Sequence, residues 1–182
     1  MAKNNEKTYW PHMIVGFLIV GFTLSYWTVK SATSMPVQES NQYMLKYQTA
    51  DININQITER KMAFDKIYTI NIVNVETMVM TDNINSNRPQ PNPVKLSQGL
   101  NTFSYEVVKK DGTNVSDINA TFLLTQPHSR REDKFFTNVP YVDGKYKIKD
   151  VNISKAGRYT LQFRAEIADV MGYSAIAAYL KP

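Results

Sequence analysis

Two methionines that are two residues apart, Met78 and Met80, are the first candidates for chemistry in this chain. Side chains two positions apart on a β-strand point to the same face, so the two thioethers would lie side by side. Thioether sulfur suits Cu(I), and His128 is the candidate for a third ligand. Methionine pairs also fill irregular gaps in hydrophobic cores. Core packing is the interpretation we favour, so copper stays a hypothesis and no metal ligand is assigned.

A second pattern is the alternation of Lys145, Lys147 and Lys149 with Tyr146 and Ile148. On a strand, this spacing places a basic row on the outer face. Such a row usually protects a sheet edge and keeps it solvated. It also suits contact with anionic lipid or with an acidic partner. We favour the solvated surface.

Two Asn-x-Ser/Thr sequences, which begin at Asn119 and Asn152, carry an aspartate two positions before the asparagine. This arrangement resembles the extended acceptor that bacterial oligosaccharide transfer prefers. Attached glycan requires an exposed asparagine in an exported protein. Glycosylation of Asn119 and Asn152 is therefore a hypothesis, which the intact mass of the protein from its native host would test.

The composition excludes several kinds of chemistry. The 182-residue chain contains no cysteine and only two histidines. Disulfides, zinc knuckles, CxxC redox pairs and thiol nucleophiles are therefore excluded. We find no Ser-His-acid arrangement, no Gly-rich phosphate loop and no acid pair that acid–base catalysis demands. We expect a protein that is not an enzyme and has no cofactor of its own.

A transmembrane helix is predicted over residues 10–29. Residues 12–29 contain no acid, lysine or arginine, and a helix of that length spans about 27 Å, close to the ~30 Å hydrocarbon core of a bilayer. Aromatic pairs stand at both ends, Tyr9-Trp10 and Tyr26-Trp27, and suit the two membrane interfaces. These features favour a retained anchor over a cleaved signal peptide.

The lysines around this helix indicate its orientation. Lys3 and Lys7 precede it, whereas only Lys30 follows closely. The positive-inside rule then places the N-terminus in the cytoplasm and the large C-terminal part in the periplasm, with the helix in a bacterial inner membrane. The net charge of +5 is therefore assigned to membrane lipid or a protein partner, and no nucleic acid is expected.

Apolar residues at helical spacing predict a juxtamembrane helix over about 38–64. The stripe contains Tyr43, Tyr47, Ala50, Ile54, Ile57 and Phe64. Residues 51–55 also alternate as in a strand, so that alternative stays open. The stripe either packs on the protein's own sandwich or meets a partner above the membrane.

From residue 67 the period of the apolar residues changes to two. Three runs alternate in this way, and their apolar positions are Phe103, Tyr105 and Val107; Ile118, Ala120, Phe122 and Leu124; and Tyr159, Leu161, Phe163, Ala165 and Ile167. Turn signals separate the runs at Lys110–Thr113, Asp143-Gly144, Lys155–Gly157 and Met171-Gly172. The pattern predicts six or seven short strands in an immunoglobulin-like antiparallel β-sandwich.

The predicted organisation is mainly β with two helices before the sandwich. Its parts are a cytoplasmic N-terminus (1–9), the transmembrane helix (10–29), a linker with the juxtamembrane helix (30–66) and the periplasmic immunoglobulin-like sandwich (67–182).

The segment Leu123–Asp133, with the sequence LLTQPHSRRED, resembles a short stretch that is typical of the FixH/CcoH family. Four further segments agree in order: Trp10-Pro11, Tyr43–Gln48, Asp143–Tyr146 and Gly157–Leu161. The resemblance implies one transmembrane helix, a periplasmic immunoglobulin-like domain, and an accessory or assembly function for cbb3-type cytochrome c oxidase of the respiratory chain, linked to copper supply. Gln126 departs from the family, which often has arginine at this position.

The same segment supplies the predicted partner contacts Pro127, His128, Arg130 and Arg131. Pro127 is expected to end a strand, and the charges from Arg130 to Asp133 are expected to form an exposed turn. Such a turn is either solvated, with local ion pairs worth ~0–1 kcal/mol each, or docks on a partner.

Small residues in the predicted transmembrane helix complete the predicted contacts. Gly16 and Gly21 would allow close approach of a second helix. The expected partners are the oxidase subunits and membrane lipid. The alternative function is that of a copper-delivery membrane protein of the metallochaperone type.

Overall fold

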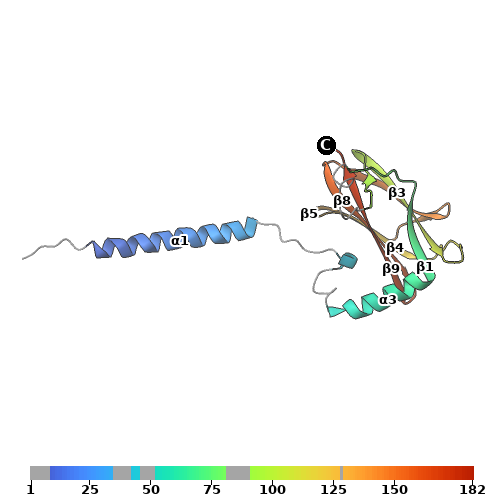
Figure 1. The fold of residues 1–182 in the computed structure, drawn as a ribbon, viewed down its shortest axis with the longest axis horizontal. Helices are drawn as coiled ribbons and strands as arrows, with labels where there is room; N and C mark the ends of the chain where they lie inside the picture. Colours follow the sequence, from blue (N-terminus) through green and yellow to red (C-terminus); the bar gives the residue numbers. More distant parts are fainter. Residues whose placement is uncertain (1–8, 35–41, 46–51, 81–90, 128) are drawn as a thin grey trace, which may run out of the picture. The chain divides into compact units, whose positions relative to one another are not determined.

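The computed structural model describes residues 9–34, 42–45, 52–80, 91–127 and 129–182. The chain divides into two compact units, Met1–Val37 and Gln38–Pro182. In the described residues the first unit is a long helix, and the second is a β-sandwich preceded by short helical segments (Figure 1). The prediction of a mainly β protein with an N-terminal apolar helix is confirmed.

Helix α1 covers Trp10–Ser34 and is 25 residues long. Its part Trp10–Thr33 is the one helix in the described ranges that is long and apolar enough to cross a membrane. The helix continues past residue 29, its predicted end, because no glycine or proline lies between that residue and Pro36. The hydroxyl of Thr33 donates to the carbonyl of Val29 at 3.0 Å, so the start of the predicted linker is helical.

The region predicted as one helix over 38–64 contains two separate helical segments in its described part. The 3-10 turn η1 covers Gln42–Met44, and helix α3 covers Ile54–Ile67. Tyr43 and Met44 have φ angles of 61° and 57°, which a right-handed α-helix does not allow. The single continuous helix is therefore wrong, whereas its second half is confirmed. The strand alternative is wrong for Ile54, which begins α3.

In the described residues, nine strands form a four-stranded and a five-stranded sheet. The first sheet has the order β1 (Tyr68–Val73), β3 (Gly99–Lys109), β7 (Lys145–Ile153) and β6 (Tyr141–Val142). The second has the order β2 (Val94–Lys95), β9 (Val170–Leu180), β8 (Gly157–Ile167), β4 (Asn119–Gln126) and β5 (Ser129–Phe136). All neighbours are antiparallel except β2 and β9. The purely antiparallel prediction is wrong at that one pair.

The core lies between the two sheets, at the positions that the alternating pattern predicts. Phe103, Tyr105 and Val107 of β3 are buried, and so are Leu161 and Phe163 of β8. The rings of Tyr105 and Phe163 stack across the core with centroids 4.3 Å apart. Buried aromatic rings contribute large apolar areas, so this pair helps to hold the two sheets together.

The chain passes from one sheet to the other at Asn74, which has a φ of 59°. Asparagine tolerates this left-handed conformation better than most residues. Beyond the kink, Thr77 forms an antiparallel bridge to Val94 of β2, in the other sheet. The kink therefore ends β1 and extends the β2 side of the five-stranded sheet.

Different contacts stabilise the two lateral margins of the sandwich. At the β1–β9 margin, α3 packs against β9, with Phe64 almost fully buried. There Arg60 donates from Nε to the carbonyl of Asp169 at 2.7 Å and lies 3.3 Å from Glu166. At the β5–β7 margin, Lys134 donates to the carbonyl of Asn152 and Lys155 pairs with Glu132.

The apolar stripe of α3 therefore packs on the protein's own sandwich. Ile57 and Phe64 are both buried, and Tyr43 in η1 makes an edge-on ring contact with Tyr173 of β9 at 4.9 Å. For these residues the own-sandwich interpretation of the stripe is confirmed.

Three of the four turn signals lie in turns or bends between strands. Lys110–Thr113 and Asp143-Gly144 form turns, and a bend lies at Lys155 before β8 begins. Met171-Gly172 is not a turn, because β9 runs through it and the chain reverses at Ala168 and Asp169 instead. Gly172 has a packing function, since an added Cβ would lie 2.3 Å from the ring of Phe64.

Candidate functional site

A shallow apolar groove on α1 is the first candidate surface for a partner. It is lined by Ile14, Phe17, Leu18, Gly21, Phe22 and Ser25. Gly21 and Ser25 are four residues apart and therefore lie on one face, where two small side chains allow a second helix to approach closely. Gly16 is not among the lining residues. Of the two predicted glycine contacts, only Gly21 therefore lines the groove. Ser25 lines it as well, and its spacing of four residues from Gly21 would have predicted this from the sequence.

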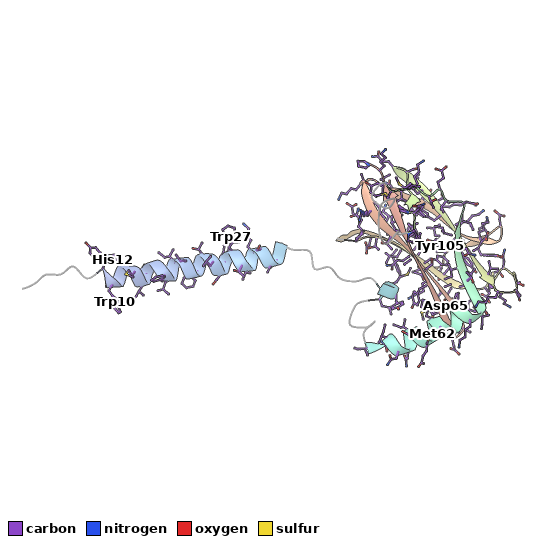
Figure 2. All side chains as sticks on the ribbon, in the orientation of Figure 1. Trp10, His12, Trp27, Met62, Asp65 and Tyr105 are labelled. Carbon is purple, nitrogen blue, oxygen red and sulfur yellow. The ribbon has the colours of Figure 1, made fainter. Side chains whose placement is uncertain are left out.

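The polar residues of α1 are compatible with an apolar surrounding. The hydroxyls of Thr23 and Thr28 donate to the carbonyls four residues earlier, both at 2.8 Å. Trp10 is the first residue of α1 and Trp27 lies seven residues before its end at Ser34, and both are exposed (Figure 2). Internal hydrogen bonds lower the cost of placing hydroxyls in hydrocarbon, and tryptophans prefer the two interfaces.

The segment that resembles the FixH/CcoH family forms a β-hairpin rather than a charged turn. Strand β4 ends at Gln126, which pairs with Ser129, the first residue of β5. Pro127 is exposed in the connection between them, so the prediction that it ends a strand is confirmed. His128 lies outside the described residues.

Arg130 and Arg131 belong to β5, and the predicted turn from Arg130 to Asp133 is therefore wrong. The cause is the register of β5 against β4, in which Lys134 pairs with Leu124 and Phe135 with Leu123. The charged run forms the last strand of its sheet, where charges discourage pairing with other chains.

Met78 and Met80 lie in an extended segment after Asn74. Met78 donates its backbone N–H to the carbonyl of Pro93 at 2.9 Å, and both side chains are half-buried while Val79 between them is exposed. The burial of the two methionines thus alternates with the exposure of Val79, which agrees with the predicted placement of both on one face. In the part of the chain that the structure describes, no group of three or more His, Cys, Asp or Glu residues could hold a metal ion.

The two glycosylation candidates lie on strands. Asn119 is the exposed first residue of β4, and Asn152 is exposed on β7. Thr121, the hydroxyl residue that follows Asn119, is 2% exposed. Glycan addition at Asn119 would therefore have to precede folding, and modification of either asparagine stays a prediction.

The basic row on β7 is present, and acids neutralise part of it. Lys145 lies 3.2 Å from Glu106, and Lys147 lies 2.6 Å from Asp143. The contact with Lys147 lowers the pKa of the Asp143 carboxyl below its usual value. Lys149 is exposed. This arrangement favours the solvated interpretation of the row.

Comparison with known proteins links the sandwich to one family. Residues 89–164 match the sequence profile of the family described as YtkA-like, which includes FixH-like periplasmic domains. The match runs from before β2 into β8 and contains the hairpin at Pro127. No curated protein gives a significant match to the chain.

The fold and the family match together indicate a class of protein. An N-terminal apolar helix that could span a membrane, followed by a sandwich similar to YtkA-like domains, fits a membrane-anchored periplasmic protein.

Proposed function

We propose that this protein is an accessory or assembly subunit of a bacterial cbb3-type cytochrome c oxidase. The observation that carries the proposal is the YtkA-like match over residues 89–164 of the sandwich, in a chain whose helix α1 contains a candidate membrane span. The resemblance of Leu123–Asp133 to the FixH/CcoH family is the reason for naming a cbb3-type oxidase as the partner. The protein catalyses nothing itself and acts by binding oxidase subunits.

Two surfaces of the chain support such binding. Within the membrane, a helix of an oxidase subunit packs in the apolar groove of α1 at Gly21 and Ser25, because small residues let two backbones approach closely. In the periplasm, the β4–β5 hairpin with Pro127, His128, Arg130 and Arg131 contacts the same complex. Its arginines meet acidic or carbonyl groups of the partner.

Co-purification of the tagged full-length protein with haem-bearing oxidase subunits in mild detergent tests the proposal. Gly21→Leu fills the groove, and we expect it to lower the amount of haem protein recovered by about tenfold, which corresponds to ~1.4 kcal/mol. Gly16→Leu adds the same side chain outside the groove and serves as the matched control. Absence of haem protein in the wild-type preparation would refute the oxidase assignment.

The hairpin is tested separately by reversing its charge. The substitution Arg130→Glu should reduce recovery of the oxidase, whereas Lys149→Glu, which changes the net charge by the same amount at an exposed position of β7, should leave recovery unchanged. Equal effects of the two changes would show that overall charge, rather than the hairpin, governs the contact.

A copper-delivery function is the second candidate, and the alternation of half-buried Met78 and Met80 with exposed Val79 favours it. Two thioethers on one side of an extended segment give soft ligands for Cu(I). Titration of the full-length protein with Cu(I) should show weaker binding in the Met78→Ala, Met80→Ala variant. Met62→Ala, which removes an exposed methionine of α3, is the control. Unchanged affinity in the double variant would remove Met78 and Met80 from this function.

A further inference from the structure

Among the residues that the structure describes, the outer edge of β1 is unpaired and uncharged. β1 is the first strand of its sheet and, within these residues, pairs only with β3, and Figure 1 shows it running along a margin of the domain from the end of α3. Its sequence, YTINIV, contains no charge and no proline. Such an edge can pair with another strand unless something guards it.

The edge strand β5 of the other sheet differs from β1 because it is highly charged. β5 carries five consecutive charged residues, Arg130 to Lys134, which is the usual protection against edge pairing. The contrast between β5 and β1 indicates that pairing at β1 is tolerated, or used, by the protein.

The hydrogen bonds of β3 show which groups of β1 face outward. The N–H of Lys110 donates to the carbonyl of Ile67, and that of Lys109 donates to Thr113, away from β1. In an antiparallel ladder, residues whose backbone groups bond to the neighbouring strand alternate with residues whose groups point away from it. The backbone groups of Thr69, Asn71 and Val73 therefore bond to β3. The backbone N–H and C=O groups of Tyr68, Ile70 and Ile72 therefore point to the outer edge, away from β3. The N–H of Tyr68 already donates to the carbonyl of Phe64.

We propose that β1 is a self-association site, where a second copy of this chain adds its own β1 in antiparallel orientation. The outward backbone N–H and C=O groups of Ile70 and Ile72 all form hydrogen bonds to the second copy only if Ile70 of each copy pairs with Ile72 of the other. The two-fold axis then passes through Asn71. This contact is isologous, so each copy presents the same surface and the assembly closes as a dimer.

The charges that flank β1 are complementary in this arrangement. Lys66 lies before β1 and Glu76 lies after it, so antiparallel pairing brings the lysine of one copy to the same end as the glutamate of the other. Glu76 also pairs with Lys95 of its own chain at 3.1 Å, so the lysine of the second copy would join an existing ion pair. Only uncharged side chains meet along the strand itself, which avoids the repulsion of like charges. Six residues make a short contact, and anchoring both copies in one membrane raises their effective concentration.

Cysteine cross-linking of the full-length protein in membranes tests this register, and the chain has no native cysteine to interfere. Asn71→Cys places two thiols across the axis with Cα atoms ~4.5 Å apart, within the ~4.4–6.8 Å that a disulfide needs. Thr69→Cys lies on the same face of β1, but its two copies are separated by about four residues, or ~13 Å.

We expect diamide to link Asn71→Cys into a dimer of twice the chain mass, at least ~10-fold more than Thr69→Cys, because only the first pair satisfies disulfide geometry. Equal linking of both variants, or of neither, would overturn the proposal. Linking of Asn71→Cys to a different polypeptide would also overturn it, because a partner other than a second copy would then occupy the edge.

Charge exchange at the same position provides an independent measurement. Asn71→Lys and Asn71→Asp should each be monomeric, because like charges would face each other at the axis. Co-expression of the two variants with different tags should restore association, since lysine then faces aspartate. Restored association also shows that both variants are folded, and its failure would contradict the predicted axis.

Discussion

The ring of Phe64 on α3 lies directly over Gly172 on β9. A Cβ at position 172 would sit 2.3 Å from Cε1 and 2.5 Å from Cζ of that ring, far inside van der Waals contact. Phe64 is 1% exposed. The glycine thus makes room for the residue that anchors α3 to the margin of the sandwich.

Gly172→Ala should destabilise the sandwich by about 1–3 kcal/mol, the usual cost of overpacking a filled core. Unfolding of the full-length protein in urea, followed by the circular dichroism of the β-sheet, measures the change. The double variant Phe64→Leu, Gly172→Ala should lose less than the sum of the two single changes, because the smaller side chain relieves the clash. Strict additivity would show that the two residues are independent.

Tyr105 and Tyr146 make a matched pair for the energetics of buried hydroxyls. The hydroxyl of Tyr105 is buried and has no hydrogen-bond partner in the described part of the chain, whereas that of Tyr146 donates to the carbonyl of Val115 at 3.0 Å. Tyr105→Phe should therefore leave the free energy of unfolding unchanged or raise it by about 1 kcal/mol, and Tyr146→Phe should lower it by about 1 kcal/mol. The same urea measurement compares them, and a greater loss from Tyr105→Phe would contradict this account.

The same tyrosines predict an alkaline limit to stability. Burial raises the pKa of Tyr105, and burial is also the main cause that raises the pKa of Tyr146 to about 12 from its ordinary 10.0. The folded state therefore holds these protons more tightly than the unfolded state. The stability they contribute is fully present below pH 10 and is lost as the pH rises toward 12.

Melting of the full-length protein at increasing pH measures this limit. Tyr105→Phe, Tyr146→Phe should flatten the decline above pH 10, because neither ring can then ionise. An equally steep decline in that variant would assign the effect to other groups.

The absence of cysteine makes the orientation in the membrane directly measurable. Lys181→Cys places a thiol at an exposed position just after β9, and Lys3→Cys places one before α1. A membrane-impermeant maleimide should label Lys181→Cys in cells whose outer membrane alone is opened. Lys3→Cys should be labelled only after the inner membrane is dissolved, as the positive-inside rule requires. The reverse pattern would invert the proposed topology.

Short-range patterns predicted much of this fold. The uncharged run before Val29 predicted α1, and the alternation around Leu161 and Phe163 predicted both a strand and its buried face. These predictions succeeded because hydrophobic periodicity is a local property of the chain. The α3 half of the juxtamembrane helix succeeded for the same reason, whereas Tyr43 and Met44 break the other half through backbone angles that no periodicity reveals.

The sequence alone determined an apolar N-terminal helix, a sandwich of alternating strands, and the absence of thiol chemistry. Only the tertiary structure decided that Arg130 lies in a strand, that Gly172 makes room for Phe64 rather than turning the chain, and that the outer edge of β1 is unpaired among the described residues. These features depend on which distant segments become neighbours. Strand order and the exposure of an edge arise from long-range contacts, and local residue patterns do not encode them.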